Sequence, residues 1–437
     1  MDIQLYDLET LSPTQRTTLL RRAEVDIAAL QDTVRPILGA VRDRGDAALL
    51  EFTERFDGVT LTADQLRVTD EEFERARNQI DPAVREAIEV SAANIRKFHE
   101  AQMPEDLWFT EVGPGILAGE KVTPIASLGL YVPRGKGSFP SVMMMLATPA
   151  SVAKVPRVVV VTPPTPEGTL DDATLVAAEL CGIREVYKVG GSQAIAALAY
   201  GTESVPRVDK VLGPGNQYVS AAKRLLYGTI DVGTPAGPSE SIVLADEHAN
   251  PDIAALDLLI EAEHGPDSAA LLVTPSRQLA EAVCERLPAL VEALPEPRRD
   301  FCTRGLATYG GIVVAPDLDA ALDFVNEFAP EHLEVLVEEP MAVLPKIVNA
   351  GEILLGENTP ITIGNFSLGV NAILPTGGFA KTFSCVTVFD FLKRSSIGYL
   401  TREGYERLAP VARTLAEIEG FPAHARALTD RPFGARR

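Results

Sequence analysis

From about residue 120 onwards, short apolar runs alternate with helical stretches, and this alternation limits the chain to a small set of folds. A first set of expected strands, separated by expected helices at 170–180 and 192–199, covers residues 157–161, 185–189 and 208–212. A second set of expected strands covers residues 241–245, 270–274, 311–315, 334–337 and 352–355. Expected helices at 252–263, 276–293 and 318–327 lie between these strands. This pattern is typical of βαβ units on parallel sheets, whose ligands bind at the carboxyl ends of the strands. The sequence therefore predicts an α/β protein with two open sheets.

Both ends of the chain are predicted to be helical. Residues 14–56 and 70–101 have helical character, and Asp81–Pro82 provides a cap and first turn for one of these helices. After residue 376 we expect a helical tail, with its clearest helix over residues 404–419. A tail of this length needs a surface to pack on, and a partner subunit would provide one.

The composition excludes several classes of function. The formal net charge is −21, from 40 basic and 61 acidic residues, which argues against binding to nucleic acid or to anionic lipid. The start of the chain lacks the features of a secretory signal, and no run of about 18 apolar residues appears. The 4 cysteines lie far apart, which favours reduced thiols over a disulfide framework. We therefore expect a cytoplasmic protein with neither a nucleic acid nor a membrane as partner.

Two short motifs carry residue types suited to catalysis. Glu261 and His264 stand three residues apart near the end of an expected helix, so both project from one face and could form half of a metal site. Glu331 and His332 precede an expected strand, where a carboxylate can activate water and an imidazole can move a proton. Taken alone, the first motif is more often a solvated helix end, and the second an ordinary polar turn.

The other histidines and the glycines give weaker indications. His99 and His248 are interpreted as surface residues, and His424, taken alone, as a structural residue of the tail. No Gly-x-Gly-x-x-Gly motif follows a strand, but glycine turns at 189–193 and 213–216 follow two successive expected strands. Such turns bring backbone N–H groups close to phosphates, although each alone is more often a plain connection. Together they leave both interpretations open, a nucleotide site and two plain connections.

Several ordered motifs resemble those of the histidinol dehydrogenase family, from about residue 25 through His424. They are LYVPRGKGSFPS (130–141), VGGSQAIAALAYGTE (189–203), DKVLGPGNQYV (209–219), PAGPSES (235–241), EAEHGPDS (261–268), FAPEHL (328–333) and NAILPTGG (371–378). The resemblance implies oxidation of an alcohol through an aldehyde to an acid, with two NAD and one zinc per subunit, in an intertwined homodimer.

The resemblance also implies the architecture of the chain. Two incomplete Rossmann-like open-sheet domains are expected, with helical N- and C-terminal extensions. The expected parts are an N-terminal arm (1–25), a first Rossmann-like domain (26–128 with 239–378), a second one (129–238) and a C-terminal helical tail that reaches the other subunit (379–437).

Site roles are carried over from the family at matching positions. Tyr131, Gln193 and Asn216 match NAD contacts, and Ser239 and Glu419 match substrate contacts. Glu331 and His332 match the catalytic pair. The zinc ligands are matched by Glu261, His264, Asn365 and His424. In the implied mechanism zinc polarises the alcohol, His332 accepts its proton, and Glu331 activates water for the second oxidation.

The chain departs from the family pattern at this site. Glu261 replaces a glutamine and Asn365 replaces an aspartate, so one carboxylate and one carboxamide remain beside the two imidazoles, a set that we expect to bind zinc. Ile361 and Ala372 replace an acidic residue and a histidine that hold the amino alcohol end of histidinol, and Arg134 is added near the cofactor loop.

These departures leave several functions open. The leading hypothesis is an NAD-dependent dehydrogenase for a small-molecule alcohol other than histidinol, because an ammonium group would lack partners here. The alternatives are histidinol oxidation to histidine, oxidation of a sulfonated propanediol whose anion meets Arg134 or Lys136, and a non-catalytic nucleotide-binding dimer.

Overall fold

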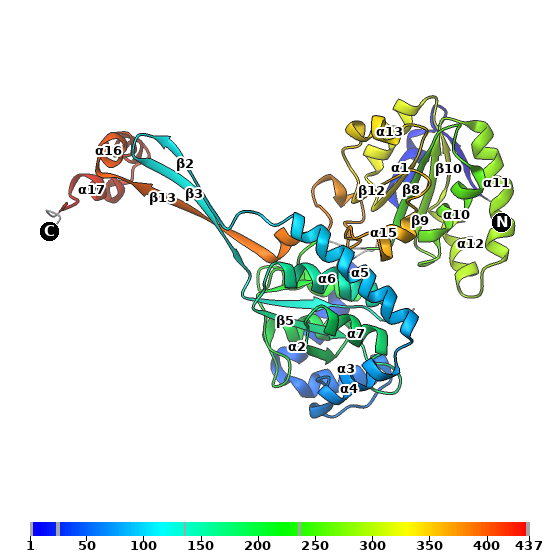
Figure 1. Cartoon of the computed structure of the whole chain (residues 1–437), viewed down its shortest axis with the longest axis horizontal. Helices are drawn as coiled ribbons and strands as arrows, with labels where there is room; N and C mark the ends of the chain where they lie inside the picture. The colour runs from blue at the N-terminus through cyan, green and yellow to red at the C-terminus, as the bar shows by residue number, and fades with distance from the viewer. Residues whose placement is uncertain (1–2, 23–26, 135–136, 235–236, 434–437) are drawn as a thin grey trace. The chain divides into compact units, whose positions relative to one another are not determined.

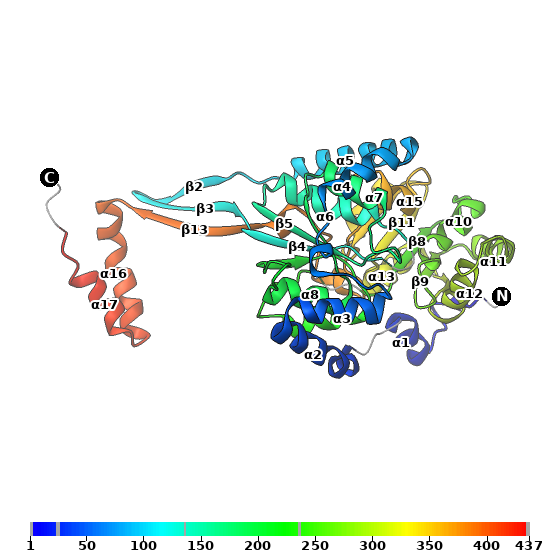
Figure 2. The same ribbon diagram turned by 90° about the horizontal axis from the view of Figure 1, so that it is seen from below.

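The computed structural model describes residues 3–22, 27–134, 137–234 and 237–433, without the side chains of 27–29. It divides into two units, which are described separately. Unit 1 comprises Met1–Gln102 and Ile125–Phe391, and unit 2 comprises Met103–Pro124 and Leu392–Arg437. In unit 1 the α/β prediction is confirmed, because two parallel sheets alternate with helices (Figures 1 and 2).

The larger sheet of unit 1 has six parallel strands. In spatial order they are β1 (Leu5–Asp7), β10 (Gly311–Val314), β9 (Ala269–Thr274), β8 (Glu240–Ala245), β11 (His332–Leu336) and β12 (Glu352–Leu355). Both faces are covered by apolar side chains, which explains why the central strands are near-continuous apolar runs.

Different helices cover the two faces of this sheet (Figure 1). The first face packs against α10 (Pro251–Ala262), α11 (Arg277–Glu292) and α12 (Arg298–Thr308). The second face packs against α1 (Pro13–Arg21) and α13 (Leu318–Phe328). Three short helical segments follow, namely α14 (Pro340–Val343), η2 (Leu344–Lys346) and α15 (Ile361–Phe366).

The smaller sheet of unit 1 has four parallel strands. In spatial order they are β6 (Glu185–Lys188), β5 (Arg157–Thr162), β4 (Ser127–Tyr131) and β7 (Lys210–Leu212). One face shares an apolar core with α2 (Ile27–Arg44), α3 (Asp46–Asp57), α8 (Gly191–Tyr200) and α9 (Gln217–Leu226). Four further helices accompany this sheet: α4 (Asp70–Gln79), α5 (Pro82–Ala101), α6 (Pro140–Val152) and α7 (Asp172–Leu180). Short 3₁₀ turns lie at η1 (Ala63–Gln65), η3 (Phe379–Lys381) and η4 (Val388–Phe391).

Unit 2 is an antiparallel sheet with two helices. The sheet order is β13 (Leu392–Leu400), β3 (Ile116–Pro124) and β2 (Leu107–Gly113). Helix α16 (Arg402–Ile418) begins beside the β2–β3 turn, where Thr401 N–H donates to Gly115 O, and α17 (Pro422–Thr429) follows it. The helical C-terminal extension is therefore confirmed, but the expectation of helix throughout the tail was wrong at β13. The domain boundaries taken from the resemblance and the intertwined dimer stay predictions.

Two smaller expectations have clear outcomes. His99 was expected at the surface, but it is fully buried, with its ring nitrogens 2.8 Å from Gln102 Oε1 and 3.2 Å from Asn371 Nδ2. His248 is exposed, as expected. Among the described residues, no helix is long and apolar enough to cross a membrane.

Candidate active site

The amino ends of β8, β11 and β12 hold the main cluster of functional side chains. His332 and Glu352 are the first residues of β11 and β12, and Glu240 is the first residue of β8. Helix α10 ends at the same edge of the sheet and brings Glu261 and His264 there. The candidate site residues of this sheet therefore lie at the amino ends of the strands, whereas the fold class predicts ligands at the carboxyl ends. The reason is that a helix lying antiparallel to the strands delivers its last turn to their amino ends.

Four residues predicted to bind metal or substrate lie together at this edge. Oε2 of Glu261 lies 2.9 Å from Nδ1 of His264, and Nδ2 of Asn365 donates to Oε1 of Glu261 at 2.9 Å. The hydroxyl of Ser239 lies 2.9 Å from the same His264 nitrogen. Glu261 is fully buried, whereas the His264 side chain is 46% exposed, so the cluster reaches from the core to a solvent-accessible rim.

The charge of Glu261 is stabilised by its neighbours. Burial acts to raise the pKa of Glu261, but the imidazoles of His332 and His264 outweigh it and lower the pKa to about 2. A carboxylate and an imidazole are both ordinary zinc ligands. Donor atoms around a tetrahedral zinc lie about 3.3 Å apart, given metal–ligand bonds near 2.0–2.1 Å, and the 2.9 Å between Glu261 and His264 is close to that spacing. Because the Asn365 amide donates through its nitrogen, its oxygen remains for a metal. These residues fit a zinc ion.

The predicted catalytic pair is buried against this cluster. Nε2 of His332 lies 3.8 Å from Oε1 of Glu261 and 3.9 Å from Oε1 of Glu331. The His332 and Glu331 side chains are 4% and 12% exposed. Burial raises the pKa of Glu331 to about 8; His332 opposes this rise, and the carboxylates of Glu261 and Glu240 add to it. A carboxyl group with a pKa near neutrality beside an imidazole is suited to exchanging protons.

Three residues of this edge had no role in the sequence analysis. Glu352 lies behind His332, with its Oε2 at 2.8 Å from Nδ1. Glu240 accepts a hydrogen bond from Gly377 N–H at 2.7 Å, and its own N–H donates to Oε2 of Glu331 at 2.9 Å. Arg22 stacks on a phenylalanine ring and lies 3.5 Å from Oε2 of Glu240. Each contact joins segments far apart in the sequence, and no local motif signals it.

The residues predicted to contact NAD gather at the carboxyl ends of the smaller sheet. Tyr131 ends β4, and its hydroxyl accepts a hydrogen bond from Gly191 N–H at 3.1 Å. Gln193 lies in the first turn of α8, and Asn216 caps α9 by accepting from the N–H groups of two residues of its first turn. Gly213 has φ +118°, and a Cβ there would lie 2.1 Å from Tyr131 O, so only glycine fits.

One cavity of about 2350 Å³ in unit 1 connects the two edges. Its lining includes Asn216 and the 213–215 turn from the smaller sheet. It also includes Ser239, Glu240 and His264 from the larger sheet. A nucleotide at the first edge and a substrate at the second would therefore share one cavity.

Glu419 and His424 belong to unit 2. Glu419 caps the end of α16, and His424 lies in α17 with its ring 5.0 Å from that of Phe421. Both side chains are exposed. Their roles as substrate contact and zinc ligand stay predictions.

The positions that depart from the family pattern have separate surroundings. Ile361 is fully buried at the start of α15, and the N–H of Ala372 faces Sδ of Met145 at 3.3 Å. Arg134 donates weakly to Pro164 O at 3.4 Å, and its Nε has no partner among the described residues. Lys136 lies outside the described residues.

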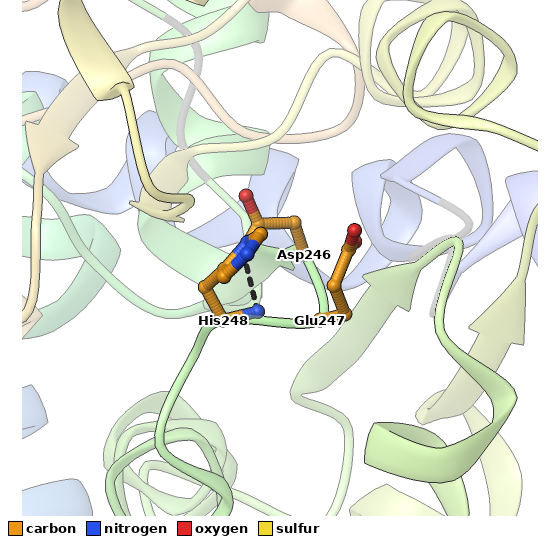
Figure 3. Close-up of side chains that lie close together, drawn as sticks. All are labelled: Asp246, Glu247 and His248. Carbon is orange, nitrogen blue, oxygen red and sulfur yellow. Dashed lines mark hydrogen bonds and ion pairs between the residues drawn. The ribbon is translucent and has the colours of Figure 1, made fainter.

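Within the described residues, one further group of side chains has the spacing of metal ligands: Asp246, Glu247 and His248 (Figure 3). The Asp246 carboxylate is already engaged, because its oxygens accept from His248 N–H at 2.9 Å and from Glu338 N–H at 2.8 Å. This group is therefore a hydrogen-bonded turn at the end of β8.

The chain is similar to known proteins over nearly its whole length. The family model described as histidinol dehydrogenase matches residues 20–432. The histidinol dehydrogenase of Synechocystis sp. is 52% identical over 98% of this chain and 99% of its own length. A histidinol dehydrogenase homolog of Cereibacter sphaeroides is 53% identical over 98% of both chains. The crystal structure of histidinol dehydrogenase from Elizabethkingia anophelis superposes with a TM-score of 0.93 at 33% identity, over 98% of this chain and 97% of that one.

Proposed function

This chain belongs to the histidinol dehydrogenase family, and from that premise we propose that it is a zinc-assisted, NAD-dependent dehydrogenase that oxidises an alcohol other than histidinol through an aldehyde to the acid. The family is NAD-dependent and binds zinc. The observation that carries the proposal is the cluster of Glu261, Asn365, Glu331 and His332, which adjoins two residues of the cavity lining, His264 and Glu240.

Different residues of the chain would serve the two oxidation steps. When bound, zinc would polarise the alcohol oxygen and NAD would take up the hydride. Glu261, His264 and Asn365, with His424 of a second copy of the chain, would hold the metal. His332 would accept the hydroxyl proton at Nε2, which faces the cluster. Glu331 would then remove a proton from the water that hydrates the aldehyde, which prepares it for the second oxidation.

The surroundings of Ile361 support a substrate other than histidinol. The acidic group that holds the amino alcohol end in the family is replaced here by a fully buried isoleucine. An ammonium group left without a partner in a buried site is strongly unfavourable. The competing candidate is histidinol itself, because a relative with 52% identity is named histidinol dehydrogenase.

A homodimer is part of the proposal. Helix α16 of unit 2 carries a row of exposed apolar side chains at helical spacing, Leu408, Val411, Leu415 and Ile418, which are 37%, 57%, 56% and 77% exposed. A row of this kind is typical of a helix that packs on another surface. A second copy of the chain is the occupant that the family supports.

The test is NAD reduction by the zinc-loaded protein with a panel of alcohols that includes histidinol and a sulfonated propanediol. We expect turnover with an alcohol that lacks an ammonium group and little turnover with histidinol. Efficient oxidation of histidinol would replace the leading proposal with the competing one. If zinc-loaded protein, with one zinc per chain, oxidised none of these alcohols, the proposed substrate class would be wrong.

A further inference from the structure

The imidazole of His332 is held from behind by Glu352, a residue outside the proposed reaction. β12 pairs in parallel with β11, and the register sets Glu352 directly opposite His332. Oε2 of Glu352 lies 2.8 Å from Nδ1 of His332, and both side chains are buried. The other ring nitrogen, Nε2, is therefore the one that faces Glu261 and Glu331, at 3.8 and 3.9 Å.

Folding alone does not explain a carboxylate at this position. The next three residues of β12, 353–355, are apolar, as expected for a covered strand. Oε1 of Glu352 has no hydrogen-bond partner among the described residues, and burial of a carboxylate costs several kcal/mol unless its partners compensate. The close partner that the structure shows for Glu352 is the His332 ring.

A glycine leaves the space that this carboxylate occupies. Gly364 lies in α15, and a Cβ there would lie 2.9 Å from Oε1 and 3.2 Å from Oε2 of Glu352. Gly364 immediately precedes Asn365, so the same short helix presents the candidate metal ligand and makes room for the carboxylate. The position of Glu352 is therefore fixed from two sides, by the strand register and by α15.

We propose that Glu352 is a positioning residue for His332: its carboxylate accepts the Nδ1 proton and so leaves Nε2 as the proton acceptor towards the alcohol. A carboxylate bound to one ring nitrogen sets both the tautomer and the orientation of an imidazole. Glu352 acts through His332 and is not among the residues that line the cavity. The inference rests on the proposed function, in which His332 is the base.

The first test is kinetic. Glu352→Gln keeps the shape of the side chain but offers an amide in place of the carboxylate. We expect kcat to fall about 10–100-fold, the usual effect of losing such a partner, while KM for the alcohol and for NAD changes by less than about threefold. Glu352→Asp, which keeps the charge, should recover part of kcat. The matched control is Glu357→Gln, an exposed glutamate five residues further along. A Glu352→Gln variant with kcat within about twofold of the parent would overturn the proposal.

The second test does not depend on activity. The chain has 5 histidines, so ring-¹⁵N-labelled protein gives few signals, and His332→Asn assigns the signal of interest. At a pH where the imidazole is neutral, we expect the parent to carry its proton on Nδ1 and Glu352→Gln to shift the proton towards Nε2. Gly364→Ala should shift the tautomer in the same direction, because it displaces the carboxylate.

A parent with its proton on Nε2, or a tautomer unchanged by Glu352→Gln, would exclude the positioning role even if the enzyme proves active. The expected shift without turnover on any alcohol would support the positioning and refute the proposed function.

Discussion

The two parallel sheets of unit 1 carry their candidate functional residues at opposite ends of their strands. The smaller sheet places Tyr131, Gln193 and Asn216 beyond the carboxyl ends of its strands, where α8 and α9 begin. The larger sheet places His332 and Glu352 at the amino ends of its strands, where α10 finishes.

This difference has an electrostatic consequence. The N-terminus of a helix carries a partial positive charge and unpaired N–H groups, which suit phosphates, whereas the C-terminus carries a partial negative charge, which suits cations. The edge of the smaller sheet is thus suited to an anionic dinucleotide. The edge of the larger sheet is suited to a metal ion and to a protonated imidazole. The side chains predicted to contact NAD at the first edge are uncharged, whereas carboxylates and imidazoles contact one another at the second.

The largest expected effect is a loss of turnover from a change at the amino ends of the larger sheet, without a change in NAD binding at the smaller sheet. His332→Asn removes the proton acceptor, so we expect kcat to fall by about 10²–10⁴-fold, the scale for a general base. The dissociation constant for NAD, measured by calorimetric titration, should stay unchanged because the nucleotide edge is intact. His248→Asn, at an exposed position, is the control. Unchanged turnover in His332→Asn would remove this residue from the reaction.

An intermediate effect is expected at the nucleotide edge. Gln193 is 1% exposed, and neither Oε1 nor Nε2 of its amide has a hydrogen-bond partner among the described residues. An unpaired buried amide costs about 1–3 kcal/mol, which a ligand can recover by bonding to it. Gln193→Leu should therefore raise the dissociation constant for NAD about tenfold, the loss of roughly one hydrogen bond.

The same variant should be at least as stable as the parent without NAD, because the unpaired amide is gone. Thermal unfolding with and without NAD measures both effects. A stability loss without NAD, together with unchanged NAD binding, would show that Gln193 is a packing residue and lies outside the nucleotide site.

How far the sequence could predict this fold depends on how local each signal is. Eight of the ten strands of the two parallel sheets were predicted within about two residues of their ends, because strands covered on both faces are continuous apolar runs, whereas β1 and β4 were not predicted. β13 was missed because LKRSSIGYL is largely exposed and acquires its strand conformation by pairing with β3, far away in the sequence.

The candidate site shows the same division. Glu261 and His264 were predicted together because one helix turn joins them, and the structure confirms their contact. Glu352 could not be found, because its contact with His332 is set by the register of two strands twenty residues apart. His99 was misassigned because its partner Asn371 lies in a distant segment.

The last expected effect, on stability alone, concerns the buried acids behind the catalytic edge. Glu334 is fully buried on β11, two residues after His332. Burial raises the pKa of Glu334 to about 9, and the neighbouring carboxyl of Asp257 adds to the rise. The folded chain therefore keeps a proton on Glu334 that the unfolded chain, with an ordinary glutamate pKa, releases well below neutral pH. Stability from this group is complete at low pH and declines as the pH rises towards about 9.

Glu334→Gln removes that titration while keeping the size and polarity of the side chain. The free energy of unfolding of the variant, relative to the parent, should therefore rise between pH 6 and pH 9, by up to about 1.4 kcal/mol per pH unit, because the folded parent holds one proton more than the unfolded parent over this range. Glu334 lies on β11, so the effect belongs to the larger sheet. Urea unfolding at several pH values measures it, with Glu247→Gln, at an exposed position of the same unit, as the control. The difference in unfolding free energy between Glu334→Gln and the parent could instead stay constant with pH. That result would mean that Glu334 is ionised in the folded chain and that the larger sheet tolerates this further buried charge.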